Sequence, residues 1–229
     1  MTEPKRRPPQ KRYTKPYKRK KPQGRKNLKA GADNKLKKVF ASIGVPEKKP
    51  FKPDPFQLQA LEAIKDGDCL VTAPTGAGKT WIAEQAIMLT LEKQGRTWYA
   101  SPLKALTNAK YNEFAQIFGE DKIGILTGDR KENPDAPIIV GTTEILRNQL
   151  YDAMHRGEDI DTDFVILDEA HYLGDEDRGV VWEETMIYLP PRIPMLLLSA
   201  TIGNADRIAG WLESIRGGTC HVVEETQRP

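Results

Sequence analysis

The sequence predicts an α/β fold in which a parallel β-sheet carries helices on both faces. From Phe56 onward, short apolar runs typical of buried strands alternate with longer stretches that have helical periodicity, and this alternation is the pattern of parallel sheets. A glycine-rich loop at residues 75–78 joins an apolar run to a helical stretch. Sheets of this kind bind ligands at the carboxyl ends of their strands, so we expect a ligand site at that loop.

The expected elements follow one another in a regular order. Helices are expected at residues 55–65, 79–92, 103–118, 143–154, 181–187 and 206–215, and strands at residues 69–73, 97–100, 123–126, 138–140, 164–167, 195–199 and 221–223. Cys69 and Cys220 lie in such apolar stretches without partners at metal-ligand spacing, so we interpret both as small buried side chains.

The first part of the chain differs in composition from the rest. Residues 1–52 contain 19 Lys and Arg and three acidic residues, whereas residues 53–229 contain 16 basic and 29 acidic residues. Residues 1–32 have almost no apolar side chains to bury, which predicts a disordered basic tail. Residues 33–54 predict a short helix followed by a proline-rich strap, and residues 55–229 form the expected α/β domain.

The basic tail favours a polyanionic partner. Its Lys and Arg can contact phosphates while Tyr13 and Tyr17 stack on unpaired bases, which predicts salt-sensitive contact with single-stranded RNA or DNA. A merely solubilising tail is the alternative. We expect a cytoplasmic protein, or a nuclear one if the host has a nucleus, because the basic runs at residues 5–7 and 18–21 fit a nuclear signal. No apolar run reaches 18 residues, so no membrane association is expected.

The strongest functional signal is the phosphate-loop sequence Ala-Pro-Thr-Gly-Ala-Gly-Lys-Thr at residues 73–80. Gly76 and Gly78 allow backbone N–H groups to close around phosphates, and the following helix adds the positive end of its dipole. Lys79 can reach the β- and γ-phosphates, and the Thr80 hydroxyl can bind magnesium. Ala73 replaces the first glycine of the strict pattern without changing these mechanics. The expected ATP-binding residues here are Thr75, Gly76, Ala77, Gly78, Lys79 and Thr80.

Two adjacent carboxylates, Asp168 and Glu169, follow the apolar run at residues 164–167. Asp168 is placed to hold Mg²⁺ directly or through water, and Glu169 to orient or deprotonate the attacking water. Adjacent acids after a strand are usually only loop residues, but about 90 residues after a phosphate loop they are its expected partner. We therefore predict that Lys79, Asp168 and Glu169 carry the hydrolysis of ATP.

Together these motifs resemble superfamily-two helicases, and within them the DExH group of superkiller and antiviral-helicase RNA motors. The resemblance covers about residues 50–229 and rests on Asp-Glu-Ala-His at 168–171, Ser-Ala-Thr at 199–201, Pro-Leu-Lys-Ala-Leu at 102–106, Thr-Gly-Asp at 127–129, residues 142–148, and residues 178–184. Ala170 departs from the subgroup, which often has Val there. The resemblance implies a RecA-like P-loop NTPase domain that is a nucleic-acid-dependent ATPase.

The resemblance also assigns further residues. Phe51 and Gln57 look like the family's adenine reader, with Phe51 stacking on the base and Gln57 matching its hydrogen-bonding edge. The alternative is that Phe51 packs in the core and Gln57 caps a helix. His171, Ser199 and Thr201 are similar to residues that couple the ATP site to the nucleic acid, although a histidine such as His171 is often structural.

In the resembling proteins, a further set of residues lines a track for the phosphates of one strand. The residues of this sequence that match it are Pro102, Lys104, Thr127, Gly128, Thr142, Thr143 and Arg147. Contacts to phosphates fix the register of a strand without reading its sequence. For Arg147, an exposed charge on a helix is the alternative.

The resemblance implies the N-terminal ATP-binding domain of an ATP-dependent RNA helicase, with single-stranded RNA or DNA as partner. A second RecA-like domain, which would supply a catalytic arginine, is expected in the parent chain, so we expect this chain to be a fragment that hydrolyses ATP slowly. A domain of a DNA repair or recombination helicase is one alternative. Another is a binder of nucleic acid that is no motor and uses ATP as a switch.

Overall fold

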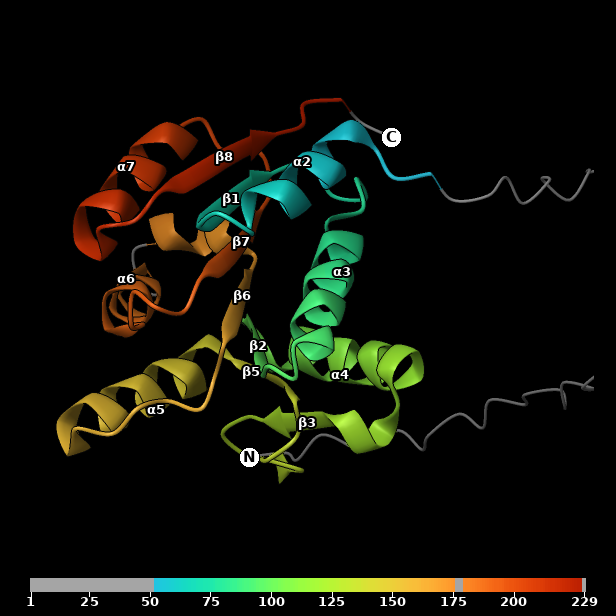
Figure 1. The fold of residues 1–229 in the computed structure, drawn as a ribbon, viewed down its shortest axis with the longest axis vertical. Coiled ribbons are helices and arrows are strands. Elements are labelled where there is room, and N and C mark those ends of the chain that lie inside the picture. Colours follow the sequence, from blue (N-terminus) through green and yellow to red (C-terminus); the bar gives the residue numbers. More distant parts are fainter. Residues whose placement is uncertain (1–51, 176–178, 228–229) are drawn as a thin grey trace, which may run out of the picture. The chain divides into compact units, whose positions relative to one another are not determined.

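The computed structural model describes residues 52–175 and 179–227, and its fold confirms the predicted α/β class (Figure 1). The helices are α2 (Pro55–Ala63), α3 (Lys79–Glu92), α4 (Lys104–Phe118), α5 (Thr143–Arg156), α6 (Gly179–Tyr188) and α7 (Ala205–Arg216). The strands are β1 (Asp68–Thr72), β2 (Thr97–Ser101), β3 (Ile123–Leu126), β4 (Lys131–Glu132), β5 (Ile138–Thr142), β6 (Phe164–Asp168), β7 (Met195–Ser199) and β8 (Cys220–Glu224). The predicted basic tail, short helix and most of the strap lie outside the described residues, as do Phe51 and Arg178.

The eight strands form one sheet in the order β4-β3-β5-β2-β6-β7-β1-β8. Neighbouring strands run parallel, as predicted, except that β4 pairs antiparallel with β3 at the edge. The sequence did not reveal β4 because both of its residues are exposed and polar, so no apolar run marks it.

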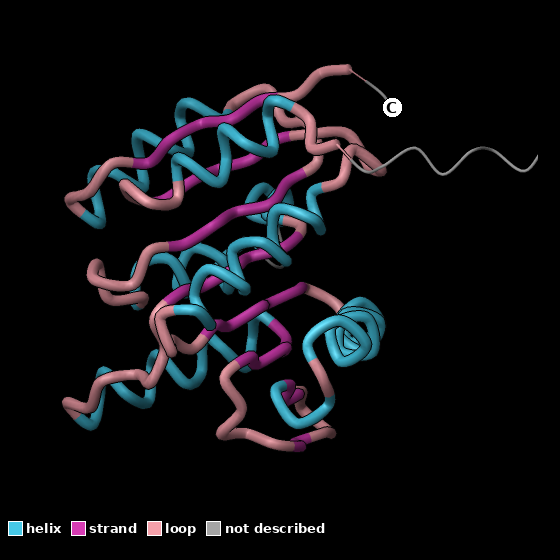
Figure 2. Tube along the Cα trace, turned by 45° about the vertical axis from the view of Figure 1, so that its right-hand side comes forward, coloured by secondary structure: helices cyan, strands magenta, loops and turns pink. Residues whose placement is uncertain are grey.

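Helices cover both faces of the sheet (Figures 1 and 2). One apolar core lies between the sheet and α5, α6 and α7, and it contains Trp98 and Trp182. The other lies between the sheet and α2, α3 and α4. Successive strand residues alternate between the two cores, so that Trp98 joins the first and Tyr99 the second. Within the described part of the chain, no helix has the length and apolar character needed to cross a membrane.

Both cysteines lie inside this fold, as expected of small apolar side chains. Cys69 and Cys220 are buried and unbonded to each other, on the neighbouring strands β1 and β8. Burial raises the pKa of each thiol to about 12. Both therefore remain protonated and unreactive at neutral pH.

A buried ion pair ties together the amino-terminal edge of the sheet. Arg216, the last residue of α7, places its Nε 2.6 Å from Asp68 Oδ2 at the start of β1. Its other nitrogens donate to the carbonyls of Leu189 and Ile193 at 2.8 and 2.6 Å. Asp68 Oδ1 in turn accepts from the backbone N–H of Met195, the first residue of β7, at 2.9 Å. The pair therefore joins α7, β1 and the connection between α6 and β7.

Replacing Arg216 with Met should lower the free energy of unfolding by about 3–5 kcal/mol, because it leaves the Asp68 carboxylate buried without its cation. Urea denaturation measures this change. The matched control is Lys65→Met, which breaks the exposed pair of Lys65 with Glu62 and should cost less than about 1 kcal/mol. A similar small loss for both variants would contradict the structural role of the buried pair.

Candidate functional site

The carboxyl ends of β1, β7 and β6 lie side by side and bring the two strongest motifs together. Thr72, the last residue of β1, pairs with Ser199 at the end of β7, and Asp168 at the end of β6 pairs with Leu198. The N–H of Ala73 donates to the carbonyl of Ser199 at 3.2 Å, which fixes the start of the phosphate loop against β7. The loop after β1 and the acids after β6 thus share one edge of the sheet.

The phosphate loop has the backbone shape that an anion site requires. Gly76 and Gly78 have φ angles of +87° and +85°, in the left-handed region that favours glycine. A Cβ on Gly78 would also lie only 2.5 Å from Gln57 Nε2. Helix α3 begins at Lys79, and no side chain among the described residues caps it. The N–H of Trp81 donates to the Gly78 carbonyl at 3.1 Å, whereas those of Lys79 and Thr80 face no acceptor within the described residues, so these two can bind phosphate oxygens and the loop fits a nucleotide.

Lys79 binds the loop on the same sheet edge as the two acids. Its Nζ donates to the carbonyls of Ala73 and Pro74 at 2.6 and 3.0 Å. Burial lowers the pKa of Lys79, while the negative charges of Glu169 and Asp168 partly oppose that shift. The ammonium group therefore lies close enough to both carboxylates to be stabilised by them, at the position from which it could reach a bound phosphate.

Asp168 is held by two donors. The buried Tyr99 hydroxyl donates to its Oδ2, and the N–H of Glu169 donates to its Oδ1 at 3.0 Å. Burial, and then the charge of Asp168, raise the pKa of Tyr99 well above its ordinary value, so the phenol remains a donor at neutral pH. This carboxylate and the Thr80 hydroxyl would supply only oxygen ligands, which suits Mg²⁺ held by one or two protein ligands and phosphate oxygens.

Glu169 adopts a strained backbone conformation beside Asp168. Its φ angle is +62°, in the left-handed region that a non-glycine residue seldom adopts. The chain turns there from β6 into a 3₁₀ helix, Ala170–Gly174. His171 Nδ1 lies 3.4 Å from Glu169 Oε2. A strained backbone conformation persists only where the surrounding structure holds the residue in place, and such residues cluster at functional sites.

Gln57 makes the contacts of a helix cap. Its Oε1 accepts from the N–H of Asp54 at 2.8 Å, and its Nε2 donates to the carbonyl of Gly78 at 3.0 Å. The residue is buried. These are the contacts of the capping alternative, with an added link to the phosphate loop. Adenine recognition by Gln57 stays a prediction, and it requires at least one of these bonds to exchange for a bond to the base.

The residues predicted to contact nucleic acid follow β2, β3 and β5, which are neighbours in the sheet. Ser101 pairs with Thr142, and Leu126 with Gly141, so these strands also end at one level. Pro102, Thr127 and Gly128 lie in the loops after β2 and β3, Thr142 ends β5, and Lys104 and Thr143 begin α4 and α5. Lys104 and Gly128 are exposed, whereas Pro102 and the three threonines are buried.

Lys104 Nζ lies 3.0 Å from Asp129 Oδ1, so a phosphate contacting Lys104 would compete with that carboxylate.

Arg147 has a different environment from the rest of this set. Its side chain is half-buried and its guanidinium donates to Glu184 Oε2 at 2.8 Å. The bond joins α5 to α6. Arg147 is therefore neither the fully exposed charge of the alternative interpretation nor a free cation, and its contact with phosphate stays a prediction.

The three predicted coupling residues lie at the ends of β6 and β7. Ser199 is fully buried, and its Oγ has no hydrogen-bond partner within the described residues. Thr201 is exposed just beyond it, and His171 approaches Glu169. A buried hydroxyl without a partner costs free energy, so Ser199 would gain from any rearrangement that supplies one.

Two residues at the site were missed by the sequence analysis. Tyr99 donates to Asp168, and Lys110 of α4 places its Nζ 2.8 Å from Thr80 Oγ1. A signal existed for each. A buried tyrosine requires a partner for its hydroxyl. Lys110 follows Thr107 by three residues and precedes Phe114 by four, and both of those face the core.

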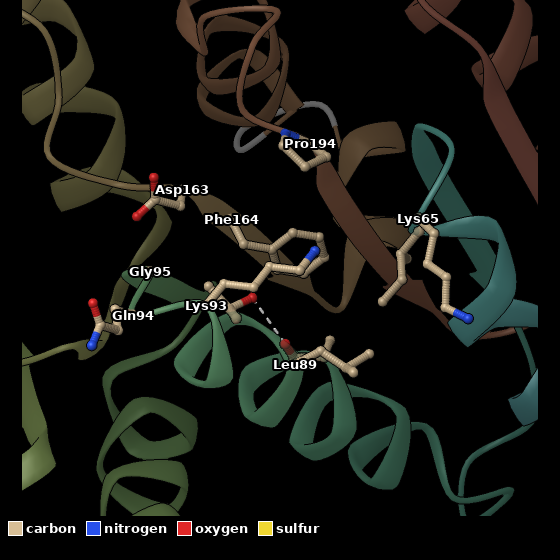
Figure 3. Close-up of a pocket in the computed structure, with 11 residues that line it drawn as sticks. Lys65, Leu89, Lys93, Gln94, Gly95, Asp163, Phe164 and Pro194 are labelled. Atoms are coloured by element: carbon tan, nitrogen blue, oxygen red, sulfur yellow. Dashed lines mark hydrogen bonds between the residues drawn. The ribbon is translucent and has the colours of Figure 1, made fainter.

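A separate pocket of about 290 Å³ lies at the opposite, amino-terminal edge of the sheet (Figure 3). Phe164 and Pro194, where β6 and β7 begin, line it together with Leu89 and Lys93 from the end of α3 and Lys65 after α2. Of the predicted nucleotide and nucleic-acid residues that the structure describes, none lines this pocket. It is therefore distinct from the phosphate loop.

Comparison with known proteins adds a family and several relatives. The model of the family "DEAD/DEAH box helicase" matches residues 54–208. The chain is 46% identical over 184 residues to the chloroplastic DExH-box ATP-dependent RNA helicase DExH15 of Arabidopsis thaliana, with 78% of this chain and 16% of that protein covered. It is 44% identical over 183 residues to the antiviral helicase SKI2 of Saccharomyces cerevisiae, with 79% and 14% covered. The chain thus spans less than a fifth of the length of these relatives.

Solved structures share the fold at lower identity. The helicase domain of Pyrococcus furiosus Hef matches with a TM-score of 0.54 and 23% identity, over 76% of this chain and 38% of that one. At this identity the likeness concerns the fold alone, and it supports a RecA-like sheet.

Replacing Gln57 with Ala should lower the free energy of unfolding by about 1–3 kcal/mol without any nucleotide, because it removes the α2 cap and the bond that ties α2 to the Gly78 carbonyl, which then keeps, within the described residues, only the N–H of Trp81 as a donor. Urea denaturation measures this change. Gln59→Ala, at an exposed position on the same helix, is the control and should change stability by less than about 0.5 kcal/mol. Unchanged stability of Gln57→Ala, with weakened ATP binding, would show that Gln57 acts on nucleotide alone.

Proposed function

The chain belongs to the DEAD/DEAH box helicase family, and on that premise we propose that it is the ATP-binding domain of an ATP-driven helicase that acts on single-stranded RNA. One observation carries the proposal. Lys79, at the start of α3, binds two carbonyls of a phosphate loop with an uncapped helix end, on the sheet edge that also carries Asp168 and Glu169, whose charges act on its ammonium group. A cation, free N–H groups and two acids at one sheet edge are the parts that phosphoryl transfer from ATP requires.

Each residue has a role in this proposal. The N–H groups of residues 76–80 and the Lys79 ammonium bind the β- and γ-phosphates. Thr80 and Asp168 would hold Mg²⁺, which when bound neutralises charge on the phosphate oxygens. Tyr99 keeps Asp168 in one orientation through its hydroxyl. Glu169, held in its left-handed conformation, orients the attacking water and accepts a proton from it.

The nucleic-acid track occupies the other half of the same edge. Lys104, Gly128 and the backbone at Thr142 and Thr143 would contact consecutive phosphates of one strand. RNA is the favoured substrate because DExH15 of Arabidopsis thaliana is an ATP-dependent RNA helicase by name and shares nearly half of the aligned residues with this chain. The superkiller-type motifs support the same choice.

We further infer that the 229-residue chain binds ATP but hydrolyses it slowly. In the family that the motifs resemble, a second RecA-like domain supplies an arginine to the γ-phosphate. Such an arginine is worth about 10³–10⁵ in rate where it has been measured.

Replacing Lys79 with Ala should weaken the binding of a fluorescent ATP analogue with magnesium at least about 100-fold, because the cation that meets the β- and γ-phosphates is lost. Titration of both chains measures the effect, with GTP as a competitor that should displace the analogue poorly. Lys93→Ala, at the other end of the same helix, is the matched control and should bind like the unchanged chain. Equal binding by Lys79→Ala would remove the basis of the proposal.

In the full-length protein, single-stranded RNA should stimulate ATP hydrolysis more than DNA of the same sequence. Glu169→Gln should lower the RNA-stimulated rate of ATP hydrolysis about 10²–10⁴-fold, because the amide cannot accept the proton of the attacking water. ATP should still bind to this variant. Glu183→Gln, at an exposed position on α6, serves as the control. Stronger stimulation by DNA would favour a DNA helicase instead, and no stimulation by either would favour a binder that ATP merely switches.

A further inference from the structure

A compact polar cluster lies between α3 and α4, directly behind the phosphate loop. It consists of Thr80 and Glu84 on α3 and of Lys110 and Glu113 on α4. Lys110 Nζ lies 2.8 Å from Thr80 Oγ1 and 2.8 Å from Glu113 Oε2. The Lys110 side chain is only 18% exposed. The ammonium group is therefore shared between a hydroxyl on one helix and a carboxylate on the other.

The fold directs Lys110 into this cluster. It lies on the inner face of α4 between Thr107 and Phe114, and its Nζ lies 5.9 Å from the centroid of the Phe114 ring. A lysine stem packed along such a face carries its charge to the nearest polar groups. Glu84 is one of these groups, since burial and then Glu113 raise the pKa of Glu84 while the charge of Lys110 lowers it. Glu113 already accepts a bond from the ammonium group, and Glu84 is close enough for the charge of Lys110 to act on it.

The contact with Thr80 conflicts with the role proposed for that residue. Thr80 Oγ1 is the hydroxyl oxygen expected to bind Mg²⁺. An ammonium group within hydrogen-bond distance of the same oxygen repels a divalent cation at that oxygen, and partial burial strengthens the repulsion. Magnesium and Lys110 cannot both keep their best contact with Thr80.

We propose that Lys110 is a positioning residue of the ATP site that competes with magnesium for the Thr80 hydroxyl. Binding of magnesium with nucleotide displaces the ammonium group from Thr80 onto Glu113 and Glu84, which neutralise it. This inference rests on the proposed function, because it requires the phosphate loop to bind nucleotide with magnesium. It also gives a physical link between the two sites, since α4 begins at Lys104 in the predicted nucleic-acid track and reaches the metal ligand through Lys110.

The test compares the dissociation constant of a fluorescent ATP analogue in excess EDTA with that in saturating magnesium. The constant in EDTA divided by the constant in magnesium measures how much magnesium strengthens binding. Binding of the metal by free nucleotide changes this ratio equally for all variants. Lys110→Met keeps the length of the side chain but removes its charge. We expect this variant to raise the ratio about tenfold, since the competing cation is gone. An unchanged or lowered ratio would overturn the inference.

Glu113→Gln is a second test of the competition, and its result does not require Lys110→Met to fold. It removes a carboxylate that draws the ammonium group away from Thr80, so the ratio should fall. In the double variant Lys110→Met/Glu113→Gln, the ratio should match that of Lys110→Met alone, because Glu113 acts through Lys110. Equal effects of Glu113→Gln in both backgrounds would show a general charge effect and would count against the inference.

Lys93→Met is the control for loss of a positive charge elsewhere on the chain, and it should leave the ratio unchanged. Urea denaturation of each variant verifies that it is folded. If the unchanged chain binds the analogue without any dependence on magnesium, the proposed function fails and the inference fails with it. If the unchanged chain depends on magnesium and Lys110→Met behaves identically, the inference alone fails.

Discussion

The shared level at which β1, β7 and β6 end is the constraint on which the rest of the site depends. Pairing of Thr72 with Ser199 and of Asp168 with Leu198 sets the phosphate loop and the acidic pair on one edge. A shift of one residue in this register would turn every side chain to the opposite face of the sheet. The buried Asp68–Arg216 pair holds the far end, because Asp68 of β1 also binds the first N–H of β7. The buried pair at the amino-terminal edge thus helps to fix the positions of the strands whose carboxyl ends carry the site.

This common edge explains how motifs dispersed along the chain can act as one unit. The phosphate loop, Ser199 and Asp168 occupy one half of it, and the loops after β2, β5 and β3 occupy the other. Helix α4 connects the halves, since it starts at the exposed Lys104 and contacts Thr80 through Lys110. Two costly features, the left-handed Glu169 and the hydroxyl of Ser199 that has no partner within the described residues, lie in the half that holds the phosphate loop. Such departures from local rules are typical of functional sites.

The sequence predicted an element correctly wherever the pattern that marks it lies within that element. Apolar runs marked the strands β1 to β3 and β5 to β8, and the helices of the described residues begin and end within two residues of their predicted bounds. The motif resemblance is confirmed by the family match and the relatives. Strand β4 was missed because Lys131 and Glu132 carry no apolar signal. Tyr99 and Lys110 were missed because their partners, Asp168 and Thr80, lie far away in the sequence, and only the sheet order brings them together.

The phosphate loop is held by protein partners at several of the groups that a nucleotide and its metal would use. Gln57 bonds to the Gly78 carbonyl, Lys79 to two loop carbonyls, and Lys110 to Thr80. A nucleotide and its metal must replace these protein–protein bonds with bonds of their own. The affinity for ATP therefore depends on the difference in free energy between the two sets of bonds, not on the new contacts alone. Each exchanged bond belongs to a different element: α2, the loop itself, or α4. Because α2 and α4 pack on the same face of the sheet, a ligand that frees Gln57 and Lys110 would act on both helices at once. Helix α4, which begins at Lys104, would then carry the effect to the predicted nucleic-acid track.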